Sequence, residues 1–174
     1  MTTTSEKFPY QAFADTLSAN KDFSTAFVDS GLAGTARRGL AIITCMDSRI
    51  NPLAIVGMKA GDVKILRNAG ARVTDDVLRT LVLAAYLLGV QRVLVMPHTD
   101  CRMTQDDESA IHQMIAQQHG IDTRDLEFRT VSDQRVALAD DVDRIRKFQY
   151  LPSNLIVGGA IYDVHTGVLV PVDC

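Results

Sequence analysis

Two short apolar runs, each followed closely by residues that can bind a metal, constrain this chain more than any other feature of its sequence. Residues 40–44 precede Cys45. Residues 93–96 precede His98 and Cys101. Such runs are typical of strands buried on both faces of a parallel sheet. Because ligands bind beyond the carboxyl ends of such strands, where the strand order reverses, we expect Cys45, His98 and Cys101 to lie together.

The rest of the chain alternates short apolar segments with segments of helical periodicity. Strands are predicted at residues 40–44, 63–66, 93–96 and 155–160, with a short antiparallel edge strand at 168–170. Helix N-caps are predicted at Thr74, Thr104 and Ser132. This order predicts an α/β fold: a mostly parallel central sheet of four to five strands, in the order 2-1-3-4, with helices on both faces.

Two of the predicted helices carry further expectations. The helix over residues 75–88 is apolar almost all round, so we expect it to be buried on more than one side. On the last helix, Asp140 and Arg144, and likewise Asp143 and Lys147, have the i,i+4 spacing of ion pairs.

The length of 174 residues favours a single domain, in which residues 1–37 form an N-terminal helical arm. Aromatic residues are concentrated in this arm, for which residues 8–30 predict one or two amphipathic helices. The helices could pack on the chain's own core or on a partner subunit. The apolar arm and the apolar helix together exceed what one small sheet can cover, which predicts a homodimer.

Charge and composition exclude several classes of protein. With 21 acidic and 18 basic residues, the net charge of −3 does not suggest a nucleic-acid surface. No apolar run approaches the ~20 residues of a membrane span. Residues 1–7 lack the pattern of a signal peptide, and an odd count of three cysteines argues against a disulfide framework. We expect a cytoplasmic protein, with Cys174 as a free thiol.

Two cysteines and one histidine form a ligand set that suits zinc. Three protein ligands leave one position for water, which is the pattern of catalytic rather than structural sites. A single cysteine after a strand, such as Cys45, is more often a small core residue. The two motifs together reverse that interpretation.

At these motifs the chain resembles the β-class carbonic anhydrases. That family shows Cys-x-Asp-x-Arg after the first strand and His-x-x-Cys after a later one, as residues 45–49 and 98–101 do. Residues 67–70 match its Arg-Asn-Ala-Gly turn, and residues 158–167 are similar to its closing hairpin. Two departures are Arg102, where the family usually has glycine, and the lack of a tryptophan that some members use to bind bicarbonate at an inhibitory site.

The resemblance implies that Cys45, His98 and Cys101 hold Zn²⁺ and that zinc-bound hydroxide hydrates carbon dioxide reversibly to bicarbonate and a proton. It also implies that Asp47, held by Arg49, accepts a hydrogen bond from that hydroxide. A homodimer, or a dimer of dimers, is implied as well.

Other roles follow from the same motifs. Gly70 is expected to bind substrate, because only backbone fits near it. Arg67 is expected to tie its turn to the sheet edge, and Asp100 and Asp163 are expected to be structural turn residues.

Two alternatives stay open. The same zinc site could hydrolyse carbonyl sulfide or carbon disulfide, which are linear and apolar like carbon dioxide. In a different class of protein, Asp47 would complete a closed site of four ligands, and the zinc would not be catalytic. A site closed in this way only at neutral pH would gain activity as the pH rises.

Overall fold

The computed structural model describes residues 8–174 and divides into two compact units, Met1–Ala33 and Gly34–Cys174. The expectation about a signal peptide concerns residues 1–7, which lie outside the described residues. In the first unit, the 3₁₀ helix η1 (Tyr10–Phe13) leads into α1 (Ala14–Ala26), and every described residue is exposed. The predicted helices of the arm are thus present. The division into one domain with an arm over residues 1–37 stays a prediction.

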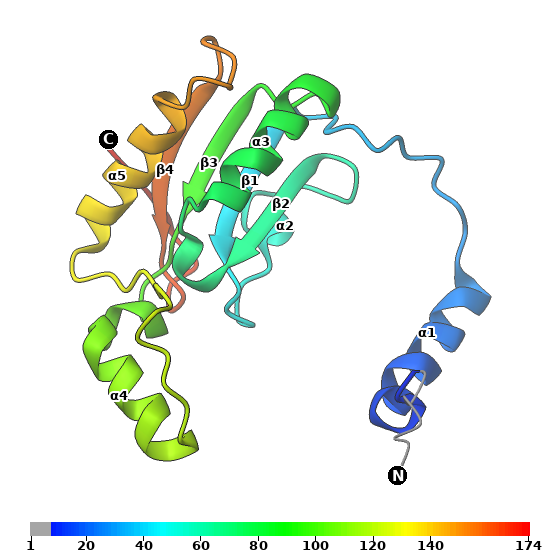
Figure 1. Ribbon diagram of the computed structural model, residues 1–174. Coiled ribbons are helices and arrows are strands. Elements are labelled where there is room, and N and C mark those ends of the chain that lie inside the picture. Colours follow the sequence, from blue (N-terminus) through cyan, green and yellow to red (C-terminus); the bar gives the residue numbers. More distant parts are fainter. Residues whose placement is uncertain (1–7) are drawn as a thin grey trace. The chain divides into compact units, whose positions relative to one another are not determined.

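The second unit is built on a five-stranded sheet. Its strands are β1 (Leu40–Cys45), β2 (Val63–Asn68), β3 (Arg92–Met96), β4 (Ile156–Tyr162) and β5 (Leu169–Val172). The spatial order is β2-β1-β3-β4-β5, with parallel pairing throughout except between β4 and β5 (Figure 1). The predicted fold class, the order 2-1-3-4 and the antiparallel edge strand are confirmed.

The helices of this unit are α2 (Pro52–Ile55), α3 (Asp75–Leu87), α4 (Glu108–His119) and α5 (Gln134–Arg146), with 3₁₀ turns η2 (Ala69–Ala71) and η3 (Arg102–Thr104). Thr74 caps α3 as predicted. The other two predicted caps are wrong, because Asp107 caps α4 and Asp133 caps α5. The hydroxyl of Thr104 instead donates to the carbonyl of Cys101 at 2.8 Å, which keeps it in η3.

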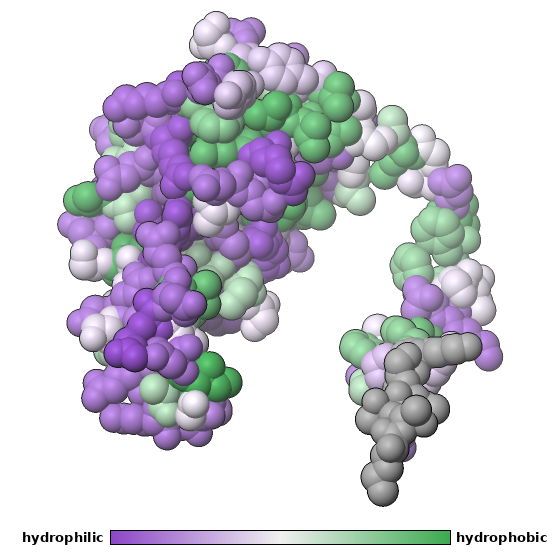
Figure 2. All heavy atoms as spheres, in the orientation of Figure 1, coloured by the Kyte–Doolittle hydropathy of each residue, from purple (hydrophilic) through white to green (hydrophobic). Residues whose placement is uncertain are grey.

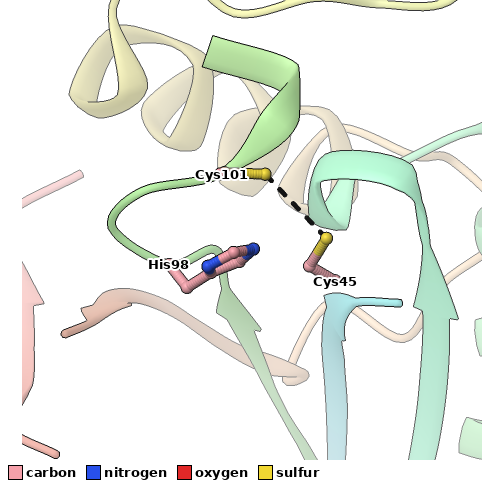
Figure 3. A group of neighbouring side chains, drawn as sticks. All are labelled: Cys45, His98 and Cys101. Carbon is pink, nitrogen blue, oxygen red and sulfur yellow. Dashed lines mark hydrogen bonds between the residues drawn. The ribbon is translucent and has the colours of Figure 1, made fainter. Parts of the chain in front are cut away.

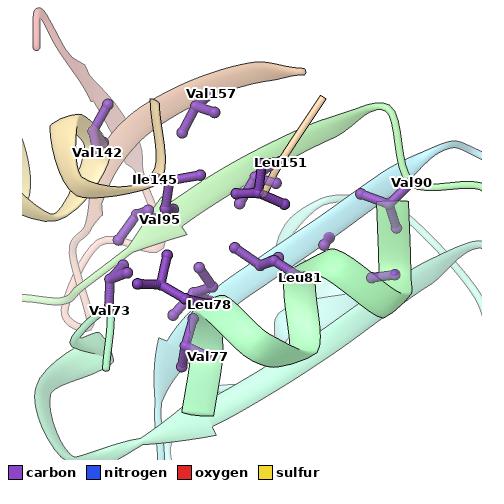
Figure 4. Close-up of a cluster of buried hydrophobic side chains, with 14 of the residues drawn as sticks. Val73, Val77, Leu78, Leu81, Val90, Val95, Val142, Ile145, Leu151 and Val157 are labelled. Atoms are coloured by element: carbon purple, nitrogen blue, oxygen red, sulfur yellow. The ribbon is translucent and has the colours of Figure 1, made fainter. Parts of the chain in front are cut away.

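The main apolar core lies between one face of the sheet and helices α3 and α5 (Figure 4). Leu81 of α3 and Ile145 of α5 are at most 1% exposed there. On the other side of α3, Leu83 and Leu87 are 46% and 68% exposed in the single chain. Burial of α3 on more than one side therefore stays a prediction. Burying one face of α3 against the sheet satisfies the packing of this subunit.

Helix α2 lies on the opposite side of the sheet, where a smaller apolar cluster includes Ile42 and Met96 (Figure 1). Helices therefore lie on both faces, as predicted. Of the two expected ion pairs on α5, Lys147 pairs with Asp143 at 2.6 Å, but Arg144 pairs with Asp75 of α3 instead. None of the helices in residues 8–174 is both long and apolar enough to span a bilayer.

Candidate metal centre

Three residues from two neighbouring strands meet at the carboxyl end of the sheet. Cys45 ends β1, while His98 and Cys101 follow β3, which pairs with β1 in parallel up to Thr44 and Met96. The two sulfurs and the imidazole lie within 4.8 Å of one another, and all three residues are buried (Figure 3). The sequence-based expectation that these side chains lie together is confirmed.

The imidazole of His98 is oriented for a ligand. Its Nδ1 lies 2.8 Å from the carbonyl oxygen of Thr99, and because a carbonyl only accepts, Nδ1 carries the proton. This leaves the lone pair on Nε2, which is buried and has no hydrogen-bond partner among residues 8–174. An unsatisfied buried acceptor costs about 1–3 kcal/mol. Nε2 is therefore the ring nitrogen that is oriented to bind a metal beside the two cysteines.

The two sulfurs lie 3.9 Å apart, within hydrogen-bonding distance of each other. The hydrogen bond with Cys101 lowers the pKa of Cys45 well below that of an ordinary thiol, against the effect of burial. The same hydrogen bond, together with burial, raises the pKa of Cys101. Burial lowers the pKa of His98, but its contact with the Cys45 sulfur outweighs this and raises it overall. Of the two thiols, Cys45 is thus the one that loses its proton more readily.

Asp47 and Arg49 form a bidentate pair at the rim of the site. Arg49 Nε lies 3.0 Å from Asp47 Oδ1, and Nη2 lies 2.7 Å from Oδ2. This side-chain hydrogen bonding holds the pKa of Asp47 well below its usual range. Asp47 Oδ2 also lies 3.8 Å from Nε2 of His98, which places the carboxylate beside the ligand set.

Asp100 does more than the turn role expected for it. It adopts a left-handed conformation, with φ of 53°, and its carboxylate accepts from Arg49 Nη1 at 2.7 Å. Its carbonyl accepts from Arg49 Nη2 at 3.0 Å. Arg49 therefore bridges both metal-ligand motifs, a link that the spacing of residues within each motif does not reveal.

Arg67 ties its turn to the sheet edge, as expected. Its Nε and Nη2 donate to the carbonyls of Cys45 at 2.9 Å and Asp47 at 2.6 Å. Gly70 has φ of 77° and donates its N–H to Cys45 Sγ at 3.4 Å, so its observed contact is with a predicted metal ligand. A substrate role for Gly70 stays a prediction.

Helix α5 contributes residues that sequence analysis missed. Gln134 Nε2 donates to the carbonyl of His98 at 2.7 Å, and Asp141 is bonded to Arg72, which follows the Gly70 turn. No motif marks these residues, and only the packing of α5 brings them to the site. Arg102, which departs from the family pattern, is paired with Asp106.

The donor set of Cys45, His98 and Cys101 fits zinc. Two sulfurs and one imidazole nitrogen are borderline-soft donors, and the buried Nε2 has no hydrogen-bond partner among residues 8–174. Both oxygens of the nearby Asp47 carboxylate accept hydrogen bonds from Arg49.

Comparisons with known proteins agree with this geometry. A family model described as carbonic anhydrase matches residues 40–169. Beta-carbonic anhydrase 1 of Mycobacterium tuberculosis is 31% identical over 158 residues, which cover 89% of this chain and 94% of that protein. A carbon disulfide hydrolase of Acidithiobacillus thiooxidans is 26% identical over 154 residues, 77% of each chain. The crystal structure of carbonic anhydrase from Streptococcus mutans matches with a TM-score of 0.87 and 32% identity, over 97% of this chain and 100% of that one.

Proposed function

The chain belongs to the β-class carbonic anhydrase family, and from this premise we propose that it hydrates carbon dioxide reversibly to bicarbonate, using zinc held by Cys45, His98 and Cys101. The observation that carries the proposal is the buried, unpartnered Nε2 of His98 beside two cysteine sulfurs. Zinc bound there would supply a Lewis acid that lowers the pKa of a bound water molecule.

The protein's own groups would prepare the site for this chemistry. The hydrogen bond from Nδ1 of His98 to Thr99 fixes the tautomer that leaves Nε2 free to bind. Two thiolates from Cys45 and Cys101 would cancel the charge of Zn²⁺. A site near neutrality overall holds an anionic product such as bicarbonate less tightly, which favours its release.

Asp47 is suited to orient a water molecule. With its pKa lowered by Arg49, the carboxylate stays ionised and can only accept hydrogen bonds. At 3.8 Å from Nε2 of His98, Asp47 would be placed to accept a hydrogen bond from a water molecule bound beside that nitrogen and so orient a lone pair of that water toward carbon dioxide. The rigid bidentate pair with Arg49 fixes this orientation.

The same pair supports an open site over a closed, non-catalytic one. Both carboxylate oxygens of Asp47 accept from Arg49, so Asp47 would have to leave this partner to fill a fourth ligand position. Breaking two charge-assisted hydrogen bonds opposes that movement.

We also propose that the chain forms a homodimer, or a dimer of dimers. Apolar side chains are exposed on both units, among them Phe23 at 62% and Tyr86 at 61%, and Figure 2 shows apolar surface on each. A second copy of the chain would cover such surface. Sedimentation at micromolar concentration should show no monomer.

A second candidate reaction is the hydrolysis of carbon disulfide or carbonyl sulfide. Relatives named carbon disulfide hydrolase match three quarters of this chain, including the protein of Saccharolobus solfataricus at 28% identity. The substrates share the shape and apolar character of carbon dioxide. The zinc ligands alone do not discriminate among them.

Stopped-flow measurement of carbon dioxide hydration by the zinc-loaded protein tests the proposed function. Carbonyl sulfide and carbon disulfide, assayed with the same preparation, give the competing rates, and zinc-stripped protein is the control. We expect hydration to be the fastest reaction and to disappear with the metal. Faster hydrolysis of either sulfur compound would transfer the assignment to that substrate, and no turnover of any of them would favour the closed site.

A further inference from the structure

The turn between β2 and α3 holds two successive residues in the left-handed backbone region. Gly70 has φ of 77° and Ala71 has φ of 61°, and both are buried. A residue with a side chain pays roughly 1–2 kcal/mol for this conformation. Backbone of this kind persists where surrounding contacts hold it in place.

Asn68 makes the first of these contacts. Its side chain brackets the turn, because Oδ1 accepts from the N–H of Arg72 at 2.8 Å while Nδ2 donates to the carbonyl of Arg72 at 2.7 Å. The two ends of the turn are thereby joined. Gly70 and Ala71 lie between them.

A buried ion pair makes the second contact and reaches the turn from α5. Asp141 is only 4% exposed. Its Oδ2 accepts from Arg72 Nε at 2.7 Å, and its Oδ1 accepts from the N–H of Val73 at 3.1 Å. Breaking a buried pair leaves an uncompensated charge, so this contact resists displacement.

The turn held by Asn68 and Asp141 places the Gly70 N–H beside Cys45. The N–H of Gly70 points at Cys45 Sγ from 3.4 Å, and η2 lies beside Cys45 (Figure 3). A hydrogen bond to a thiolate withdraws electron density from the sulfur. It also restrains the direction in which that sulfur meets a metal.

We infer that Arg72 and Asp141 are positioning residues of the metal centre, which act by aiming the Gly70 N–H at the sulfur of Cys45. The inference rests on the proposed function in that Cys45 is taken as a metal ligand. Among residues 8–174, neither residue is hydrogen-bonded to Cys45, His98 or Cys101, and both act through the left-handed turn. Through Asp141, helix α5 thereby influences the hydrogen bonding, and so the electron density, of the Cys45 sulfur.

Two variants sever the pair from opposite sides: Asp141→Asn removes the charge at nearly constant size, and Arg72→Met removes the guanidinium at similar length. Asp76→Asn breaks the exposed Arg79–Asp76 pair of α3 and serves as the matched control. Near-ultraviolet circular dichroism of each variant reports folding. Because Arg72 is the more exposed partner, Arg72→Met carries the test if Asp141→Asn does not fold.

The first readout is the amide proton of Gly70, followed by NMR in the metal-free protein. Loss of the Arg72–Asp141 pair should weaken the hydrogen bond from the Gly70 N–H to the Cys45 sulfur. The Gly70 amide resonance should therefore move upfield, and its exchange with solvent should become faster. Since no metal is needed, this readout tests the effect of the Arg72–Asp141 pair on Gly70 even if the proposed function fails.

The second readout is the sulfur-to-cobalt charge-transfer band of the Co²⁺-loaded protein. A thiolate that loses a hydrogen bond donates more strongly, so the band should move to longer wavelength in both variants. Zinc affinity, measured by competition with a chelator, should weaken about 10-fold, as is typical for lost outer partners of a metal site. The double variant should lose no more than either single variant, since both remove one interaction.

The outcomes separate the two proposals. Wild-type protein that binds neither cobalt nor zinc would overturn the proposed function. Wild-type protein that binds metal, with a Gly70 resonance and a cobalt band that stay unchanged in Arg72→Met as they do in Asp76→Asn, would overturn the positioning role.

Discussion

The apolar core beneath α3 and α5 and the metal centre at the carboxyl end of the sheet are built by opposite means. In the core, Leu81 and Val142 are completely buried among other apolar side chains, on regular helical backbone. At the metal centre, His98 is as deeply buried but has an unpartnered nitrogen, and Ala71 and Asp100 have left-handed backbone.

This contrast teaches where stability and function reside. Packing of apolar surface stabilises the fold, whereas the metal centre holds groups that each cost free energy. The centre keeps its shape through contacts from regular elements, such as Arg67 of β2 and Gln134 of α5. Changes at the centre should therefore remove chemistry while the fold survives, and changes in the core should do the reverse.

The largest expected effect follows from His98→Ala. Removing one of three ligands should abolish zinc binding and carbon dioxide hydration, because the remaining two sulfurs do not complete the donor set. The far-ultraviolet circular dichroism spectrum should stay that of the wild type. His119→Ala, on the exposed end of α4, is the matched control and should keep about one zinc per chain. Full zinc content in His98→Ala, by elemental analysis, would contradict the assignment.

Asp47→Asn should keep the metal and lose turnover. An amide replaces the acceptor that orients water, and kcat for hydration should fall about 100-fold. Asp122→Asn is a close control, because Arg124 binds Asp122 with the same i,i+2 pattern far along the chain. Undiminished kcat in Asp47→Asn would remove Asp47 from the mechanism.

In the core, Gly159→Ala of β4 should destabilise the fold. A Cβ at Gly159 would lie 2.9 Å from Cγ of Leu138, and overpacking of this kind costs about 1–3 kcal/mol. A Cβ at the adjacent Gly158 would meet nothing within 4 Å, so Gly158→Ala should be neutral or slightly stabilising. Urea unfolding measures both. Equal stabilities would show that Leu138 moves aside freely.

The smallest expected effect concerns Asp62, at the amino end of the sheet and away from both regions. The N–H of Lys59, followed by Arg37, holds the pKa of Asp62 below its usual value. Because the folded pKa is the lower one, this carboxylate stabilises the fold at neutral pH, and its contribution is lost as the pH falls below about 4. Asp62→Asn should be less stable than the wild type at pH 7, and the gap should close in acid. A gap that is independent of pH would contradict this assignment.

Local patterns predict most of the fold and the convergence of Cys45, His98 and Cys101. The apolar run ending at Cys45 and the one preceding His98 specify buried parallel strands, and adjacency of β1 and β3 brings their ends together. Helix starts were less predictable, because polar residues that can cap lie close together in sequence. The sequence predicts Ser132 as the cap of α5, but the neighbouring Asp133 takes this role and accepts two backbone hydrogen bonds.

Contacts that depend on tertiary packing were out of reach. Arg72 and Asp141 are 69 residues apart, and no spacing rule joins them. The sequence predicts a turn role for Asp100 but not its ion pair, because the partner, Arg49, follows a different strand. The apolar surface of α3 was correctly identified, but its pattern does not say which side packs within the subunit.

X-ray absorption at the zinc edge of the loaded wild-type protein tests the central claim most directly. The account predicts about one zinc per chain, with two sulfur neighbours near ~2.3 Å and lighter nitrogen or oxygen neighbours near ~2.0–2.1 Å. The sulfur count should fall to one in Cys101→Ala if that variant retains metal. A spectrum of the wild type without sulfur, or with four sulfurs, would contradict the centre formed by Cys45, His98 and Cys101.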